Sequence, residues 1–308
     1  MVRGQGLWNS YGENGMNKLK QRQAYPLDLK IAMTKKRITE FYDHFDGQVY
    51  VSFSGGKDST VLLHIARELY PCIDVVFCDT GLEYPEIRDF VKTINNVTWI
   101  KPKITFKEVI QKYGYPIISK EQSQFIDEYR NTNSEKLKDI RYNGNKWNRG
   151  KISNKWRYIV DSPFKVSHKC CNVLKKNPFK KYEKDTGKKP IIGTMANESA
   201  LRTSQFKKDG CNAFNTKRPV SKPMSFWTDS DVWEYIKTKE IKYSNIYDMG
   251  YCRTGCMFCM YGLHMDEEPN RFNIMKETHP KQYEYCMKKL GIEDVLEWYP
   301  VKKEDENE

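Results

Sequence analysis

The hydrophobic positions of the chain alternate between short continuous runs and helical periods. Four apolar runs predict strands that are buried on both faces, over residues 49–53, 73–78, 97–100 and 191–193. Apolar residues at helical spacing predict helices over residues 27–45, 60–70, 86–94 and 106–113. Strands that alternate with helices are typical of a parallel, doubly wound α/β sheet. We therefore expect the loops after residues 53, 78 and 193 to face one ligand, because ligands bind beyond the carboxyl ends of such strands.

The pattern changes after residue 113 and predicts further divisions of the chain. Gly114-Tyr115-Pro116 is a turn signal, and the stretch beyond it becomes rich in basic residues and poor in apolar ones. This composition predicts a mobile basic insertion or lid over about residues 131–160. The expected organisation is a flexible arm (1–24), an α/β domain (25–220), a helical C-terminal region (221–300) and a disordered tail (301–308).

Length and composition limit the class of protein. The 308 residues suffice for one large α/β domain or for one domain with a smaller appendage. No apolar stretch is long enough to cross a membrane, and no apolar segment follows the N-terminus as in a secretory signal. Nine cysteines without such a signal predict a reduced, cytoplasmic protein whose clustered cysteines serve metal or redox chemistry.

The net charge of +12 is concentrated in one segment. Residues 131–190 contain 17 Lys and Arg against 5 Asp and Glu, a surplus equal to that of the whole chain. Aromatic residues lie among these cations, namely Tyr142, Trp147, Trp156 and Tyr158. Cations interleaved with aromatic rings suit the phosphates and bases of DNA or RNA. The alternative is a solvated lysine-rich surface that also helps to hold an anionic nucleotide.

The strongest motif is Ser54-Gly55-Gly56-Lys57-Asp58-Ser59, between the first predicted strand and a predicted helix. A strand that enters a helix through small residues presents backbone N–H groups and the helix dipole to one point, and Lys57 adds a full charge. These features predict a phosphate site. The pattern is not the Walker loop. It resembles the PP-loop of enzymes that cleave ATP or related nucleotides between the α and β phosphates. The alternative is a glycine turn in which Asp58 or Ser59 caps the helix.

Three further blocks resemble the phosphoadenylyl- and adenylyl-sulfate reductases. They are Asp79-Thr80-Gly81 with Tyr84-Pro85-Glu86, Gly193 with Glu198-Ser199 and Arg202, and Trp227-Thr228-Asp229 onward to Gly255-Cys256. The resemblance implies the Rossmann-like adenine-nucleotide α-hydrolase fold. It also implies nucleotide binding, with Mg²⁺, by Ser54–Ser59, Asp79, Thr80, Gly81, Gly193, Glu198 and Ser199. Lys57, Asp58 and Arg202 are the catalytic candidates. A forked guanidinium such as that of Arg202 suits a phosphate or sulfate.

The cysteines form a second constellation. Cys170 and Cys171 are adjacent, and Cys256 and Cys259 form a C-x-x-C pair far downstream. Four thiolates suit zinc or a [4Fe–4S] cluster, and spacing alone does not choose between them. Cluster-bearing adenylyl-sulfate reductases have the same paired cysteines and a later G-C-x-x-C. This resemblance implies that Cys170, Cys171, Cys256 and Cys259 bind a [4Fe–4S] cluster.

The chain also departs from those reductases. It lacks their C-terminal E-C-G-[LI]-H motif, whose thiolate attacks sulfur, and its one late cysteine is Cys286 inside a helical pattern. Met195 replaces the first arginine of the G-x-R block, and a thioether cannot donate a hydrogen bond to sulfate. No residue of the sequence is therefore an evident candidate for the nucleophile.

Three hypotheses remain open. In the first, ATP binds the PP-loop, and the protein uses ATP cleavage and its cluster for sulfur transfer to nucleic acid, resembling phosphorothioation and tRNA-thiolation enzymes. Adenylyl sulfate is the alternative nucleotide substrate. A cysteine desulfurase or thiol donor would then be a partner. In the second, the protein is a sulfonucleotide reductase that uses Cys286 or an outside thiol and releases sulfite. In the third, it is a nucleotide or redox sensor without turnover. The oligomeric state stays open, a homodimer included.

Overall fold

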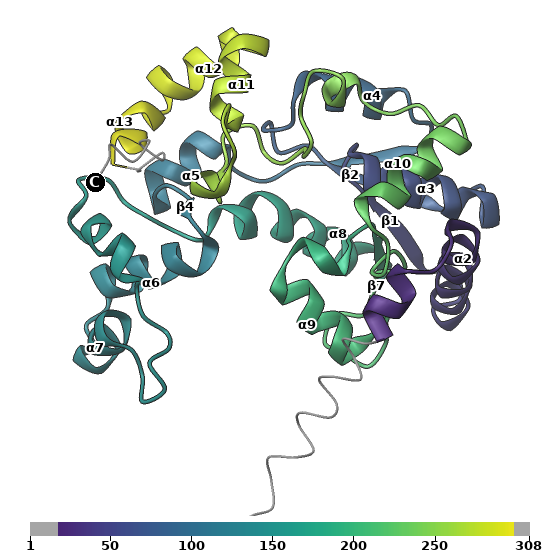
Figure 1. Ribbon diagram of the computed structural model, residues 1–308, viewed down its shortest axis with the longest axis horizontal. Helices are drawn as coiled ribbons and strands as arrows, with labels where there is room; N and C mark the ends of the chain where they lie inside the picture. Colours follow the sequence, from purple (N-terminus) through teal and green to yellow (C-terminus); the bar gives the residue numbers. More distant parts are fainter. Residues whose placement is uncertain (1–17, 299–308) are drawn as a thin grey trace, which may run out of the picture. The chain divides into compact units, whose positions relative to one another are not determined.

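The computed structural model describes residues 18–298, and these residues divide into two compact units (Figure 1). The sheet unit comprises the described residues up to Cys78 together with Pro85–Ile100 and Phe179–Asn245. The cysteine unit comprises Asp79–Tyr84, Lys101–Pro178 and the described residues from Ile246 onward. This division differs from the expected boundary near residue 220, because residues 221–245 fold with the sheet and residues 101–178 do not.

The sheet unit contains a six-stranded sheet in the order β3-β2-β1-β5-β7-β6. Its strands are β1 (Val49–Phe53), β2 (Asp74–Cys78), β3 (Val97–Ile100), β5 (Lys189–Ile192), β6 (Asn212–Ala213) and β7 (Val220–Ser221). All neighbouring pairs are parallel except β6 with β7, and Val51 lies opposite both Val75 and Ile191. The four strands predicted from apolar runs are confirmed to within two residues at each end. The Rossmann-like α/β fold class is also confirmed.

Helices cover both faces of this sheet. They are α2 (Leu27–His44), α3 (Lys57–Leu69), α4 (Pro85–Lys92), most of α8 (Asn177–Thr186), α9 (Ala200–Asp209) and α10 (Asp229–Thr238), with the short turn η3 (Ala196–Glu198). The turn η4 (Asn245–Tyr247) begins at the last residue of the sheet unit and continues in the cysteine unit. Tyr50 and Phe53 lie three residues apart in β1, so their side chains point to opposite faces of the sheet. Phe53 packs near Phe90 of α4, and Tyr50 packs near Phe179 of α8. This two-sided burial explains why β1 is apolar along its length, and each such side chain contributes about 1.5–3 kcal/mol.

The N-terminal part of the described chain is not a loose arm. Residues 18–23 are helical, and Leu19 is 3% exposed. The expected flexible arm over 1–24 is therefore wrong for its described residues, because an apolar side chain is buried there. Residues 1–17, and the expected tail at 301–308, lie outside the described residues.

The cysteine unit is mainly helical. Its elements are α5 (Phe106–Tyr113), β4 (Ile117–Ile118), α6 (Lys120–Asn131), α7 (Glu135–Asn143), η1 (Asn154–Asp161), η2 (Asn172–Lys176), β8 (Met260–Tyr261), η5 (Leu263–Met265), α11 (Arg271–Thr278), α12 (Pro280–Glu284), η6 (Tyr285–Lys289) and α13 (Ile292–Glu297). The two short strands β4 and β8 pair in parallel. This pairing brings the segment after α5 beside the residues that follow the C-x-x-C pair. Between residues 18 and 298, no helix has the length and apolar character that crossing a membrane requires.

The basic insertion has more regular structure than its low hydrophobicity predicts. Helix α7 begins at a cap in which Ser134 Oγ accepts from Leu137 N. The guanidinium of Arg130 in α6 donates to the carbonyls of Ile159, Val160 and Ser162. One half-buried cation thus satisfies several loop carbonyls and ties η1 to α6. The sequence analysis did not predict this order, because the hydrogen bonds that hold the insertion join polar groups far apart in the chain.

Candidate nucleotide site and cysteine cluster

The 54–59 loop lies at the carboxyl end of β1, and α3 begins within it at Lys57 with Gly56 as N-cap. Gly55 has φ +74°, and a Cβ there would lie 2.8 Å from methyl carbons of Ile87 and Val91. A Cβ on Gly193, after β5, would lie 3.0 Å from the carbonyl oxygen of Asp58. Both positions therefore require glycine, because a neighbouring residue approaches the backbone too closely for a side chain. The loops after β1 and β5 meet at the first turn of α3, as the sequence predicted.

The loop is held by its own polar side chains. Ser59 Oγ donates to Gly56 O at 2.9 Å and accepts from Ser54 N at 3.2 Å. Thr60 Oγ1 also donates to Gly56 O, at 3.0 Å. The first N–H groups of an α-helix lack partners within the helix, and they point here out of a pre-shaped turn. The arrangement suits a polyphosphate, which needs several fixed donors at once.

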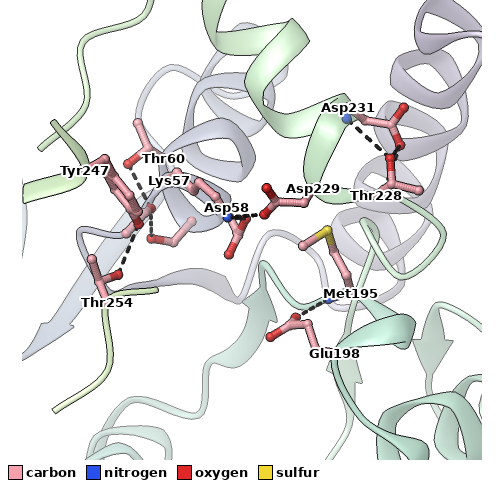
Figure 2. Close-up of polar contacts among 12 residues, drawn as sticks. Lys57, Asp58, Thr60, Met195, Glu198, Thr228, Asp229, Asp231, Tyr247 and Thr254 are labelled. Atoms are coloured by element: carbon pink, nitrogen blue, oxygen red, sulfur yellow. Dashed lines mark hydrogen bonds and ion pairs between the residues drawn. The ribbon is translucent and has the colours of Figure 1, made fainter. Parts of the chain in front are cut away.

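Lys57 is the charged centre of this loop. Its side chain is buried, and its ammonium lies 3.2 Å from Asp58 Oδ1 and 2.5 Å from Asp229 Oδ1 (Figure 2). Burial disfavours the cation, but the two carboxylates outweigh burial and raise the pKa of Lys57. Burial also raises the pKa of Asp58, against the pull of Lys57. The loop thus holds a fixed positive charge between two carboxylates.

Asp229 is a residue that the sequence analysis did not select. It is the first residue of α10, whose N-cap Thr228 forms a capping box with Asp231. Asp231 is fixed in turn by the buried Lys30, whose Nζ lies 2.7 Å from Asp231 Oδ2. The signal was present in the Trp227-Thr228-Asp229 block. The motif could not show that Asp229 lies beside Lys57, because α2, α3 and α10 come together only in the folded chain.

Glu198 and Arg202 lie near the same loop but contact each other. Glu198 forms an ion pair with Arg202 and also accepts from Met195 N at 2.7 Å. Its charge is close enough to help raise the pKa of Asp58. Ser199 caps α9 by accepting from Arg202 N. The structure therefore brings Glu198 to the loop, while Ser199 has a local structural role.

Asp79, Thr80 and Gly81 belong to the cysteine unit, although Asp79 directly follows β2. Asp79 Oδ1 accepts from Gly81 N at 3.1 Å. Thr80 donates to Glu83 through both its N–H and its hydroxyl, at 2.9 and 2.8 Å. These contacts form a tight local turn. The nucleotide-binding role of the three residues stays a prediction.

The four candidate cysteines are mutual neighbours inside the cysteine unit. Burial raises the pKa of Cys170, and the charges of Cys171, Cys256 and Cys259 raise it further. Cys171 also acts on Cys256 and on Cys259. Cys256 and Cys259 share a turn in which Cys259 N donates to Cys256 O at 3.1 Å. Residues 85 apart in the sequence are therefore gathered at one place, as the two pairs predicted.

Lys175 lies beside these thiols. It follows Cys171 by four residues in the π-helical turn η2, and its side chain forms a hydrogen bond with Cys256. The Cys256 charge is the main cause that raises the pKa of Lys175. Burial raises the pKa of Cys256, against the pull of Lys175. A cation placed against several thiols suits a centre with net negative charge.

The arrangement bears on which metal centre fits. Among residues 18–298, no three His, Cys, Asp or Glu side chains are placed so as to hold a single ion. Tetrahedral zinc needs its sulfurs within about 2.3 Å of one point. An iron–sulfur cluster is larger and takes four thiolates from around its volume. Four neighbouring thiols with a lysine beside them are donors that either metal centre accepts, so the choice between zinc and a cluster stays a prediction.

These features define a class of protein in which an α/β sheet carries a glycine-rich loop with a buried lysine and a second unit gathers four cysteines. The family model described as the phosphoadenosine phosphosulfate reductase domain matches residues 48–261. The chain therefore belongs to this family, and the resemblance inferred from its motifs is confirmed.

Individual relatives carry different names. An uncharacterised protein of Methanocaldococcus jannaschii is 27% identical over 87% of this chain and 54% of its own length, so the chain spans about half of that relative. The adenosine 5'-phosphosulfate reductase of Staphylococcus epidermidis is 21% identical over 71% of this chain and 72% of the reductase. The U34-tRNA thiolase NcsA of Methanococcus maripaludis, solved with its [4Fe–4S] cluster, has a TM-score of 0.38 at 16% identity, covering 92% of this chain and 85% of its own. This structural likeness is weak and assigns no activity.

Proposed function

We propose that this protein binds ATP at the 54–59 loop, cleaves it between the α and β phosphates, and takes part in sulfur transfer to nucleic acid. The observation that carries the proposal is the buried Lys57, held between Asp58 and Asp229 at the first turn of α3. A fixed cation beside helix N–H groups stabilises the charge that develops on a leaving pyrophosphate. Membership of the phosphoadenosine phosphosulfate reductase domain family supports nucleotide chemistry at this loop.

The side chains of the loop have separate proposed roles. Lys57 and the first N–H groups of α3 receive the β and γ phosphates. The carboxylates of Asp58 and Asp229 offer oxygen ligands to Mg²⁺, which prefers such donors. Arg202 contacts a phosphate oxygen by exchanging its present partner Glu198.

The chemistry balances without a redox step at the loop. An oxygen of the acceptor attacks the α phosphorus, the bond to the β-phosphate oxygen breaks, and pyrophosphate leaves with the electron pair. The terminal sulfur of a persulfide, from a desulfurase or thiol donor, then displaces AMP and leaves the acceptor joined to the donor by a disulfide. A second thiol of the donor attacks the donor sulfur of that bond, is oxidised to a disulfide, and releases the thiolated acceptor. Lys57 acts in the first step, where negative charge builds on the leaving group.

Cys170, Cys171, Cys256 and Cys259 are the proposed ligands of a [4Fe–4S] cluster. The four thiols are close enough for their charges to interact, and Lys175 lies beside them; both observations support this choice. When bound, such a cluster can pass electrons or coordinate sulfur. All nine cysteines are free thiols, which is consistent with the reduced cytoplasmic setting that we propose.

A sulfonucleotide reductase is the second candidate, and named relatives favour it. One observation weighs against the version that uses Cys286. This thiol is 0% exposed, and burial raises its pKa. A reactive cysteine needs access and thiolate character. A reductase built on this chain would therefore depend on an outside thiol.

The two candidates separate in a direct assay. Protein purified without oxygen is incubated with ATP and Mg²⁺, with and without nucleic acid, and pyrophosphate is measured. In parallel it is incubated with adenylyl sulfate and a thiol, and sulfite is measured. We expect pyrophosphate release from ATP. Sulfite release that needs no nucleic acid and survives Cys286→Ala would replace the proposal with the reductase, and absence of both products would favour a sensor.

A further inference from the structure

The cysteine unit carries a hollow that the proposed chemistry does not use. Its volume is about 440 Å³, and it is lined by α5, the segment around residue 164 and the turn before α13. Its lining contains no carboxylate. Four exposed lysines surround it, namely Lys107, Lys165, Lys288 and Lys289. Like charges that converge on one concave surface raise its positive potential and attract anions.

A second hollow adjoins the first. It has a volume of about 280 Å³ and shares Lys165 with the first hollow. Lys112 and Lys169 line it, and Asp127 is its one acidic residue. The ammonium groups of Lys112 and Lys169 lie 5.4 and 5.2 Å from the centre of the Tyr113 ring. Positive charge therefore continues from one hollow to the next.

We name these six side chains the lysine surface: Lys107, Lys112, Lys165, Lys169, Lys288 and Lys289. Within residues 18–298, an ion pair is described for one of them, Lys288 with Glu293. Among the described residues, no ion pair is formed by the other five, and Asp127 is the one carboxylate that lines the second hollow with Lys112 and Lys169. A surface of this kind is more costly to maintain than one with mixed signs, and an anionic partner removes that cost.

The backbone beneath Lys165 is fixed. Tyr115 N donates to Lys165 O at 2.8 Å, and Ser167 N donates to Tyr115 O at 3.0 Å. A Cβ on Gly114 would lie 2.4 Å from the Lys165 carbonyl carbon, so the two segments are in close contact. Tyr115 also donates to Leu290 O at 2.7 Å, which ties the turn before α13 to the same point. Lysines from three segments are thereby held at set positions.

We propose that the lysine surface binds the sugar–phosphate backbone of a single nucleic-acid strand, the acceptor of the sulfur. This inference rests on the proposed function and names where its partner is held. Two adjoining hollows accommodate successive phosphates better than one small anion. Lysines neutralise phosphates without reading bases, so binding depends on salt and only weakly on sequence. The lysine surface lies outside the basic insertion, on α5, on residues 165–169 and on the turn before α13.

Binding is tested with the cluster-containing protein, without ATP, by the fluorescence anisotropy of labelled single-stranded RNA and of DNA with the same sequence. The variant is Lys165→Ala/Lys289→Ala. The matched control is Lys36→Ala/Lys92→Ala, which removes two exposed lysines from α2 and α4 of the sheet unit. We expect the variant to lose roughly tenfold in affinity and the control to change little. The slope of log affinity against log salt should fall by about 0.7 per lysine removed.

Other results would overturn the inference. If variant and control bind equally well, the lysine surface is not the site of the strand. If tripolyphosphate competes as strongly as the oligonucleotide, the surface binds a small anion instead. If the wild type binds neither RNA nor DNA, the inference fails, whereas pyrophosphate release from ATP alone would still support the loop chemistry. That basal release should be the same in variant and control, so the two failures are distinguishable.

Discussion

At the scale of single residues, the chemistry depends on side chains whose charge is set by a few neighbours. Lys57 is buried yet stays charged because Asp58 and Asp229 face it. Lys175 has the same relation to the Cys256 thiol. In each unit one lysine is placed against acidic groups, and one substitution in each unit tests the proposed chemistry.

The first test removes the cation of the loop. Lys57→Ala should lower pyrophosphate release by at least about 10²-fold, because the leaving group loses its fixed positive charge. The visible absorbance of the cluster should be unchanged, because its proposed ligands belong to the other unit. Turnover and the absorbance spectrum are measured on the same anaerobic preparation. Loss of the absorbance would mean that Lys57 acts on more than its own loop.

The second test removes a proposed cluster ligand. Cys171→Ser should reduce iron, sulfide and visible absorbance together, since a hydroxyl is a poor substitute for a thiolate ligand. The matched control is Cys72→Ser, which changes an exposed cysteine of the sheet unit. Iron and sulfide are assayed on both proteins. An unchanged spectrum in the first variant would remove Cys171 from the ligand set.

At the scale of elements, the first residue of α10 adds a carboxylate to the 54–59 loop. Asp229 is the first residue of α10, and the start of this helix is fixed by the capping box and by the buried pair of Lys30 with Asp231. Helix α2, through Lys30 and Asp231, thus helps to set where Asp229 lies. The π-helical turn η2 has a comparable role after Cys171, because it places Lys175 against the thiols.

The buried pair gives a test at this scale. Lys30→Met should destabilise the fold by about 3–5 kcal/mol, because Asp231 keeps a buried charge without its cation. The control is Lys35→Met on the same helix, whose partner Glu68 is partly exposed, and it should cost less than about 1 kcal/mol. Urea unfolding measures both, and the KM for ATP should rise only in the first. Equal stability of the two variants would show that the pair does not hold α10.

At the scale of the whole molecule, the chain passes between two units several times. Residues 79–84 leave the sheet unit and are followed by α4 and β3, which return to it. Residues 101–178 leave it again and are followed by α8, β5 and α10. Each unit buries its own core, with residues such as Val51 and Phe77 in one and Ile117 and Met260 in the other. A ligand held by one unit should therefore protect that unit most.

Hydrogen exchange tests this independence. Removal of the cluster should speed amide exchange in peptides that contain η2 and β8, because their proposed ligands lose a shared centre. Peptides from β1, β2 and β5 should keep their protection, since these strands pair with one another. Mass spectrometry of the protein with and without its cluster gives both values. An equal rise in β1 would mean that the two units unfold together.

The sequence alone determined the sheet strands, the glycine-rich 54–59 loop between β1 and α3, and the two cysteine pairs. Each rests on local signals: continuous apolar runs such as 49–53, small residues such as Gly55 and Gly56, and thiols at short spacing. Only the tertiary structure decided that Asp229 faces Lys57, that Lys30 fixes Asp231, and that lysines from α5 and the turn before α13 share one surface. These pairings join residues far apart in the chain, and burial and charge select them only after the sheet and helices have packed.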